Sequence, residues 1–329
     1  MKQNQSKLQL ILKGAAMGVA EVIPGVSGGT IAFITGIYET LINSIKAFGP
    51  EALQGWKVGG VKGMWAAING DFLLWLLAGM IGGIGCGIFG VTYLLEHYPE
   101  PLWAFFFGLI LASAVYISRQ VSRWQVSTVL ALVIGAVVAY LLTSLSPATG
   151  SLHPLYVFVS GAIAISALML PGISGSFILL IMGMYTIIVP LLKDTLRSFD
   201  ASGLGTIIIF SLGCLTGLVV FSRVLSWLFA KYQDVTIAML TGFLIGALNK
   251  VWPWRNVTSI LDKDTNTIHQ IGQIADLQRF GTDQLKVLSE SNVLPSDYWG
   301  LSPMVGICAA AAVLGLIMVL GLARLEQSK

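Results

Sequence analysis

Two short motifs combine proline, glycine and hydroxyl side chains inside apolar sequence. The first reads Pro-Gly-Val-Ser-Gly-Gly-Thr over residues 24–30, and the second reads Pro-Gly-Ile-Ser-Gly-Ser over residues 171–176. Proline lacks an amide hydrogen and glycine costs about 1 kcal/mol relative to alanine in a helix, so each motif must end one helix before the next begins. The first amides of a new helix, with nearby hydroxyl groups, form a site for an anion such as phosphate.

The candidate phosphate-binding residues are the glycines and hydroxyl residues of both motifs, namely Ser27, Gly28, Gly29, Thr30, Ser174, Gly175 and Ser176. Arg223 interrupts an apolar run and is a further candidate, because a guanidinium can hold a phosphate by two parallel hydrogen bonds. Its place near the end of that run also fits a side chain that extends to the membrane surface. Arg119 is a candidate for secondary head-group contacts. The alternative for both motifs is that they are only tight packing corners.

Two carboxylates are candidates for coupling transport to an ion. Glu21 stands three residues before Pro24, where low dielectric constant and the negative end of a helix dipole both favour the neutral carboxyl. It could therefore load and release a proton, or make a purely structural hydrogen bond. Glu39 lies ten residues beyond Gly29, about 15 Å along the helix, and either serves in coupling or reaches the inner interface. The second motif has Leu168 in place of Glu21, so any coupling is asymmetric.

The two motifs belong to an internal duplication. Residues 24–38 align with residues 171–185 at a shift of 147, with eight identities in fifteen positions. The identical pairs are Pro24 and Pro171, Gly25 and Gly172, Ser27 and Ser174, Gly28 and Gly175, Ile31 and Ile178, Ile34 and Ile181, Gly36 and Gly183, and Tyr38 and Tyr185. Further along, a shift of 134 places Gly79 and Gly83 on Gly213 and Gly217. One shorter loop in the second half explains the change of register.

Composition places the chain in a membrane. The 329 residues are 55% hydrophobic and 11% charged, and the mean hydropathy is +0.81. Several apolar runs approach the ~20 residues that cross a bilayer. A net charge of +3 gives no reason to expect nucleic-acid binding. The three cysteines and three histidines lack metal-ligand spacing, so we expect no metal and no cofactor.

We predict an all-α integral membrane protein made of two repeats, each a re-entrant, broken helical hairpin followed by three transmembrane helices. The first repeat, 1–150, has its hairpin over 8–46, a linker over 47–70 and spans over 72–95, 101–118 and 126–145. The second repeat, 151–329, has its hairpin over 154–192 and spans over 204–230, 235–251 and 303–323. Residues 252–302 form an insertion, and the spacing of Ile268, Ile271, Ile274 and Leu277 predicts an amphipathic helix in it.

The repeats are expected to have inverted topology. A hairpin returns the chain to the side it came from, and three crossings then deliver the second half to the opposite side. With both termini in the cytoplasm, 12 basic and 6 acidic residues lie inside (+6), and 7 basic and 10 acidic residues lie outside (−3). This distribution agrees with the positive-inside tendency and places the insertion 252–302 outside the cell.

Both motifs, together with Gly36-Ile37-Tyr38-Glu39, Gly183-Met184-Tyr185 and Trp252-Pro253-Trp254, resemble the polyprenyl-phosphate transporter family of bacterial inner membranes. The resemblance covers essentially the whole chain. It implies a flippase that returns undecaprenyl phosphate, the lipid carrier of peptidoglycan precursors, from the outer to the inner leaflet for recycling. The implied partners are the polyprenyl-phosphate lipid, membrane lipids and a coupling proton, with oligomeric state left open.

The main alternative is an enzyme. Residues 21–30 also resemble the undecaprenyl-pyrophosphate phosphatase family, which carries Glu-x-x-Pro-x-Ser-Ser and Pro-Gly-x-Ser-Arg-Ser-Gly motifs. Here Gly175 occupies the arginine position and no histidine follows the first motif. The charge clamp that phosphoryl transfer needs is therefore missing, and we predict that the chain is not an enzyme. A small-anion carrier would use the same broken helices and remains an alternative.

Overall fold

The computed structural model describes residues 6–23, 27–145, 148–198, 201–262, 267–273, 285–300 and 302–327. Pro24 and Gly25 of the first motif lie outside the described residues, as do Ile274 and Leu277 of the insertion. The corresponding predictions are therefore not addressed at these positions.

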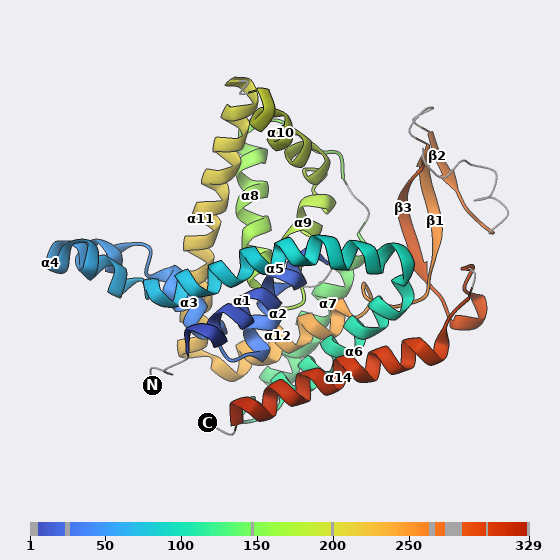
Figure 1. The fold of residues 1–329 in the computed structure, drawn as a ribbon, viewed down its shortest axis with the longest axis horizontal. Helices are drawn as coiled ribbons and strands as arrows, with labels where there is room; N and C mark the ends of the chain where they lie inside the picture. The colour runs from blue at the N-terminus through green and yellow to red at the C-terminus, as the bar shows by residue number, and fades with distance from the viewer. Residues whose placement is uncertain are drawn as a thin grey trace.

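Helices form most of the described chain (Figure 1). The first half contains α1 (Lys7–Val22), α2 (Gly28–Ile34), α3 (Tyr38–Lys46), α4 (Pro50–Ala67), α5 (Gly70–His97), α6 (Pro99–Ser118) and α7 (Val126–Ser144). The second half contains α8 (Pro154–Met169), α9 (Gly175–Ile181), α10 (Tyr185–Ser198), α11 (Ala201–Lys231), α12 (Gln233–Ala247) and α14 (Val305–Gln327).

Length and apolar composition allow several of these helices to cross a membrane. Four stretches qualify within the described chain, namely Pro50–His97, Pro99–Ser118, Val126–Ser144 and Gly203–Lys231. The bent pair α9 and α10, with an angle of 113° between its parts, raises the number to five. Large apolar side chains such as Phe89, Leu141, Leu215 and Leu314 are exposed on the outer faces of these helices, as lipid contact requires. The prediction of a helical membrane protein is confirmed.

Glycines bring α1 against α5, and the same arrangement recurs where α8 meets α11. A Cβ added to Gly79 would lie 2.1 Å from the Ile11 carbonyl oxygen, and one added to Gly213 would lie 2.1 Å from the Phe158 oxygen. These contacts correspond at the shifts of 134 and 147 found in the sequence. Two further contacts match in the same way. Gly83 packs against Ala15 as Gly217 packs against Ala162, and Gly14 packs against Leu76 as Gly161 packs against Phe210.

A second matched pair of contacts joins the two halves. Gly108 of α6 lies against Ala312 of α14, and Gly242 of α12 lies against Leu132 of α7. These contacts relate α6 to α12 at the shift of 134 and α7 to α14 at a shift of 180. The larger shift reflects the insertion that separates α12 from α14. The sequence comparison used only the shifts of 147 and 134 and therefore missed the correspondence of α7 with α14. The matched contacts support the duplication.

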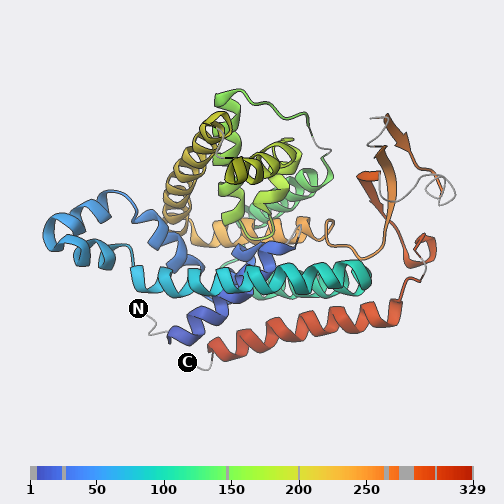
Figure 2. The same cartoon turned by 45° about the horizontal axis from the view of Figure 1, so that its top comes forward.

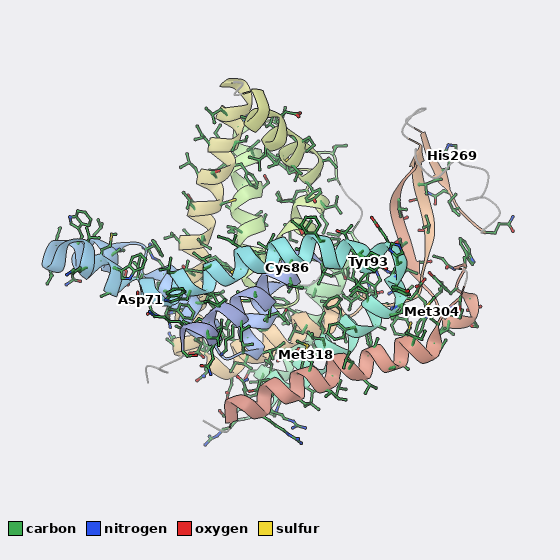
Figure 3. All side chains as sticks on the ribbon, in the orientation of Figure 1. Asp71, Cys86, Tyr93, His269, Met304 and Met318 are labelled. Atoms are coloured by element: carbon green, nitrogen blue, oxygen red, sulfur yellow. The ribbon has the colours of Figure 1, made fainter. Side chains whose placement is uncertain are left out.

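The two pairs of long helices run in different directions. In Figure 1, α8 and α11 rise across the direction followed by α5 and α14. The start of α1 and the end of α14 lie at the same end of the molecule in both views, while the strands lie at the opposite end (Figures 1 and 2). Asp71 and Tyr93 mark the two ends of α5 (Figure 3), and Asp71 accepts a hydrogen bond from Trp65 Nε1 at 3.1 Å.

The hairpins predicted over 8–46 and 154–192 were expected to continue as one helix after each motif, and both expectations are wrong in the same way. α2 ends at Ile34 and α9 at Ile181, because the following glycines, Gly36 and Gly183, have φ values of 66° and 67°. The Ile37 N–H donates to the Ala32 carbonyl, and the Met184 N–H donates to the Leu179 carbonyl in the same way. Each helix end needs a glycine in the left-handed conformation. The repeated glycines therefore terminate the two short helices.

The prediction of a linker over 47–70 is also wrong, because residues 50–67 form α4. Pro50 begins the helix, where a missing amide hydrogen is harmless. Gly60, with a φ of 59°, interrupts it, and the two parts fold back so closely that a Cβ on Gly55 would lie 2.6 Å from the Gly63 carbonyl oxygen. The glycines that indicated a loop instead allow two short helices to pack together.

The amphipathic helix predicted within 252–302, from Ile268 onward, is wrong at its start, because Thr267–Gln270 form a strand, and its continuation over 274–284 lies outside the described residues. The described part of this insertion forms an antiparallel sheet in the order β2-β1-β3, with β1 (Arg255–Asp262), β2 (Thr267–Gln270) and β3 (Leu285–Asn292). A short 3-10 helix, η2 (Pro295–Asp297), follows. β-branched residues such as Val257, Thr258 and Ile260 favour a strand, and β1 pairs on both edges. The sheet is the exception to the all-α prediction.

Candidate functional site

The two broken motifs meet in the interior of the protein. Ser27 and Thr30 are completely buried, and Ser174 is 3% exposed. Among the described residues, three hydrogen bonds join the hairpins: Ser27 Oγ to the Leu168 carbonyl at 3.2 Å, Tyr38 Oη to the Met169 carbonyl at 2.7 Å, and the Gly172 N–H to Thr30 Oγ1 at 3.0 Å. The structure therefore brings together residues that lie about 140 positions apart in the sequence.

Ser27 starts α2 and also contacts the other hairpin. Its backbone is extended, with φ −120° and ψ 136°, and its Oγ accepts the Gly29 N–H at 3.1 Å. This is the role of a serine at the N-cap of a helix. Ser174 has a similar backbone but does not cap α9, because its Oγ lies 2.9 Å from that of Ser176. Ser176 is exposed, so the second motif is the more accessible of the two.

Glu21 occupies the backbone donor that was expected to be free for an anion. Its Oε1 accepts the Gly28 N–H at 2.6 Å. A carboxylate at this position offers the same negatively charged oxygen that a phosphate would present to the amide. The Glu21 carboxylate thus binds the Gly28 amide that was predicted to bind the substrate. Glu21 and the first motif form a single cluster in the structure.

Lys13 holds the other end of α2, a contact that sequence reasoning missed. Its Nζ donates to the Thr35 carbonyl at 2.5 Å. Glu21 and Lys13 therefore lie at opposite ends of α2, and the sign of each charge matches the helix end that it contacts. At the shift of 147 the second half has Leu168 and Ser160, which are uncharged. The sequence signal that could have indicated this contact was a lysine within an apolar helix, eight residues before Glu21.

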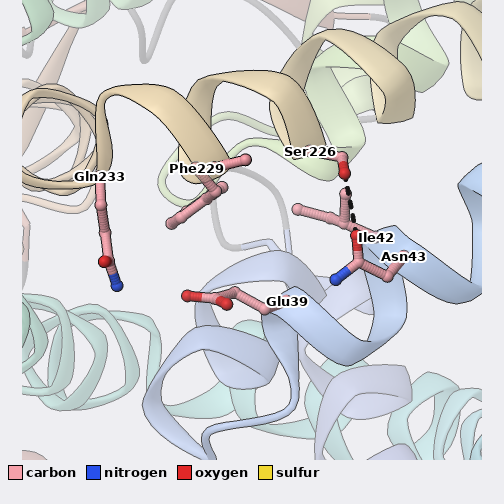
Figure 4. Close-up of a pocket in the computed structure, with 7 residues that line it drawn as sticks. Glu39, Ile42, Asn43, Ser226, Phe229 and Gln233 are labelled. Atoms are coloured by element: carbon pink, nitrogen blue, oxygen red, sulfur yellow. Dashed lines mark hydrogen bonds between the residues drawn. The ribbon is translucent and has the colours of Figure 1, made fainter.

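Glu39 lines a different cavity, of about 180 Å³, between α3 and α11 (Figure 4). Asn43 and Ser226 also line it, with Ser226 Oγ donating to Asn43 Oδ1 at 2.9 Å, and Gln233 faces Glu39 from the far side. Phe229 forms a further wall, and its ring lies 5.8 Å from that of Tyr38. Glu39 is exposed to this cavity and lies apart from the motif tips.

The two arginines that were candidates for phosphate contacts lie at the surface. A Cβ on Gly49 would be 2.2 Å from Arg223 Nη2, so the Arg223 guanidinium lies against the turn between α3 and α4. Arg119 follows the last residue of α6 and is exposed. The structure places neither with the motif residues. Over the described ranges, no group of three or more histidine, cysteine or acidic residues is arranged to hold a metal.

Comparison with known proteins identifies the family. Residues 17–269 match the model of the undecaprenyl phosphate translocase-like family. The chain is 44% identical to a polyprenyl-phosphate transporter of Vibrio cholerae over 312 residues, which cover 94% of this chain and 96% of the relative. It is 30% identical to a polyprenyl-phosphate transporter of Staphylococcus aureus over 257 residues, covering 74% of this chain and 85% of the relative. No solved structure matches the chain.

Both relatives are named as transporters and neither as an enzyme, which confirms the prediction that this protein is not an enzyme. The family match and the identity to the Vibrio cholerae protein each extend over more than half of the chain. The chain therefore belongs to the undecaprenyl phosphate translocase-like family.

Proposed function

We propose that this protein carries undecaprenyl phosphate from the outer to the inner leaflet of the bacterial cytoplasmic membrane, driven by protons. The names of its relatives support transport of a polyprenyl-phosphate lipid. The direction follows from the recycling role that the family resemblance implies. Both termini lie in the cytoplasm in this proposal, and the sheet lies outside.

The buried junction between the two hairpins is the observation that carries the proposal. Ser27 and Thr30 supply two hydroxyls, and Gly172 supplies a backbone N–H, to the contact between the two hairpins, so both halves of the chain contribute. In the structure the Gly172 N–H donates to Thr30 Oγ1, and Ser27 Oγ donates to the Leu168 carbonyl. A phosphate that arrives between the hairpins replaces these bonds with its own oxygens, so substrate binding and separation of the tips occur together. Non-helical backbone within a membrane is tolerated where it is buried or lines such a site.

Glu21 provides the coupling in this proposal. While the carboxyl is ionised, it keeps the Gly28 N–H occupied. A protonated carboxyl is a weaker acceptor and releases the amide to a phosphate oxygen. Proton uptake by Glu21 and phosphate binding therefore favour each other, and the lipid head group moves with a proton.

The matched helix contacts support an inverted repeat as the moving framework. α1 on α5 has its counterpart in α8 on α11, and α6 on α14 has its counterpart in α12 on α7. Each half carries one motif to the junction. We propose that one half rocks against the other, exposing the junction first to one side of the membrane and then to the other, while the prenyl chain stays in lipid.

The test is transport by purified protein in liposomes that contain undecaprenyl phosphate in one leaflet. Wild-type exchange should fall as pH rises, by at most about tenfold per pH unit for one coupled proton. The Glu21→Gln variant should fold normally and lose this pH dependence, because its side chain cannot ionise. Glu51→Gln, which changes an exposed residue of α4, is the matched control and should behave as wild type.

Two results would contradict this proposal. Equal pH dependence in Glu21→Gln and wild type would remove Glu21 from coupling, and loss of dependence in Glu39→Gln alone would move the role to the cavity of Glu39. Phosphate release from undecaprenyl pyrophosphate should be measured in the same liposomes. Exchange without release supports transport, whereas release without exchange would overturn it.

A further inference from the structure

A second, larger cavity lies beside the sheet and carries unbalanced positive charge. Its volume is about 570 Å³, and its walls come from the end of α7, from α9, from the turn after α12 and from β1 and β3. Among the described residues, the charged side chains that line it are those of Lys250, Arg255 and Glu290. These three contribute +1, +1 and −1, a net charge of +1. An anion of phosphate type would balance the cavity.

Lys250 is the cation without a charged partner in this cavity. Over the part of the chain that the structure describes, its ammonium makes no hydrogen bond and no ion pair, and it lies over the ring of Phe177, 5.0 Å from the ring centroid. Lys250 is partly buried, and a buried ammonium without hydrogen-bond acceptors is costly. The free donors of Lys250 therefore point to a ligand that supplies anionic oxygens.

Arg255 is held in place by groups that leave it facing the same cavity. Its Nη1 lies 2.9 Å from Glu290 Oε2, and its guanidinium carbon lies 4.5 Å from the centroid of the Trp103 ring. Only 13% of its side chain is exposed. An arginine fixed by one carboxylate and one aromatic face keeps further N–H donors for a second anion. Arg255 can thus join Lys250 on one phosphate group.

The cavity adjoins both the second motif and the lipid. Phe177 and Leu180 of α9 line it, and Phe177 directly follows the exposed Ser176. Tyr140 and Leu145, at the end of α7, also line it and are 53% and 52% exposed. A lipid can therefore keep its apolar chain against α7 while its head group enters the cavity, one residue away from the hydroxyls of the motif.

We propose that this cavity is the receiving site for the phosphate monoester head group of a lipid on the sheet side of the membrane, with Lys250 and Arg255 as its ligands. The inference rests on the proposed transport function and adds to it a binding step before the head group reaches the junction of the motifs. Glu290 positions Arg255 and limits the positive charge, so that the head group is held and then released.

The test measures binding of farnesyl phosphate to full-length protein in nanodiscs, with farnesol and inorganic phosphate as separate probes. Lys250→Met should weaken farnesyl phosphate binding at least about tenfold, because a charge-assisted hydrogen bond is lost, while Lys250→Arg should retain most of the affinity. Lys231→Met is the matched control: Lys231 also lies over aromatic rings, those of Trp227 and Tyr232, but outside this cavity. It should bind as wild type.

Glu290→Gln distinguishes a binding site from a purely structural ion pair. It raises the net charge of the three charged lining residues from +1 to +2 and frees Arg255, so farnesyl phosphate should bind more tightly. Weaker or unchanged binding would overturn the assignment. Thermal melting of each variant in detergent shows whether the compared proteins are folded. If Lys250→Met is not folded, Lys250→Arg, which keeps the positive charge, is compared with wild type instead.

The remaining outcomes separate the head group from other ligands and this site from the transport function. Farnesol binding as tight as that of farnesyl phosphate, or equal binding by wild type and Lys250→Met, would overturn the site. Tighter binding of inorganic phosphate than of farnesyl phosphate would assign the cavity to free phosphate instead of a lipid. Liposome transport is measured in parallel. If the wild-type protein shows no exchange, the proposed function is contradicted. If wild type and Lys250→Met exchange the lipid equally well, only the receiving site is contradicted.

Discussion

Glu21 and Lys13 make the two halves of a duplicated protein chemically different. Each holds one end of the seven-residue helix α2, Glu21 at the Gly28 N–H and Lys13 at the Thr35 carbonyl. Their counterparts in the second half, Leu168 and Ser160, place an apolar and a neutral side chain around α9. In the proposed mechanism this difference makes the first half the coupling half, because only Glu21 can take up a proton.

Asp234 shows how one exposed carboxylate joins the first turn of α12 to the loop between α6 and α7. It accepts backbone N–H groups from Ser122 at 3.0 Å and Arg123 at 3.1 Å, and these hydrogen bonds, first that of Ser122, hold the pKa of its carboxyl below the usual range. A depressed pKa stabilises the folded protein above the ordinary value of about 4, and this contribution is lost as pH falls through the lower folded value.

We therefore expect the melting temperature of wild type to exceed that of Asp234→Asn near neutral pH, and the difference to close on acidification below about pH 4. Thermal unfolding in detergent, measured from pH 3 to 7, checks this. A constant difference across the range would show that ionisation of Asp234 contributes nothing to stability.

At the scale of elements, backbone contact through glycine sets the packing of the long helices. α5 has seven glycines, and they differ in what surrounds them. Gly79 and Gly83 face α1 so closely that any side chain meets a carbonyl oxygen, whereas Gly82, Gly85 and Gly90 face open space. Small residues at such contacts let helices approach in a membrane, where no hydrophobic effect drives them together. The glycines at open positions are not needed for packing.

A larger side chain should therefore lower the free energy of unfolding at a glycine that faces α1 and leave it nearly unchanged at a glycine that faces open space. Gly79→Val places a side chain 2.1 Å from the Ile11 carbonyl oxygen and should destabilise the protein by about 1–3 kcal/mol or more. Gly82→Val, three residues away on the same helix, should have little effect. The free energies of unfolding of both variants, measured by denaturant titration in mixed micelles, provide the comparison, and equal losses would show that the α1–α5 contact does not depend on glycine.

At the scale of the whole molecule, the arrangement separates two ends. The start of α1 and the end of α14 lie at one end, and the sheet lies at the other (Figures 1 and 2). If both termini lie in the cytoplasm, the sheet and the cavity of Lys250 face the outside, from which the lipid enters in the proposed function. The motif junction then lies between the receiving cavity and the cytoplasmic end.

This orientation predicts the accessibility of two exposed positions. In a chain whose three native cysteines are replaced by alanine, Leu294→Cys, next to η2, should react with a membrane-impermeant thiol reagent added to whole cells. Gln120→Cys, between α6 and α7, should react only after the membrane is permeabilised. The reverse pattern would invert the topology, and labelling of both positions in intact cells would contradict a single orientation.

Local chemistry explains why much of this protein could be read before its fold was known. Proline and glycine interrupt helices wherever they occur, so the two breaks near residues 24–28 and 171–175 follow from the residues alone. Runs of apolar residues require lipid or a core, and the spans were predicted within a few residues of α5, α6, α7 and α11. The repeat at 147 likewise needs no coordinates.

Partners in space depend on packing, and no sequence spacing reports them. The carboxylate on the Gly28 N–H, the lysine on the Thr35 carbonyl and the bond from Gly172 to Thr30 arise because α1 and the second hairpin surround α2. The same holds for the sheet, whose strands form only because β1 offers two edges, and for the cavity that joins Lys250 to Phe177 across more than seventy residues. Breaks and membrane segments are local properties of the chain, whereas the identity of the group that satisfies each buried donor is settled only when distant helices meet.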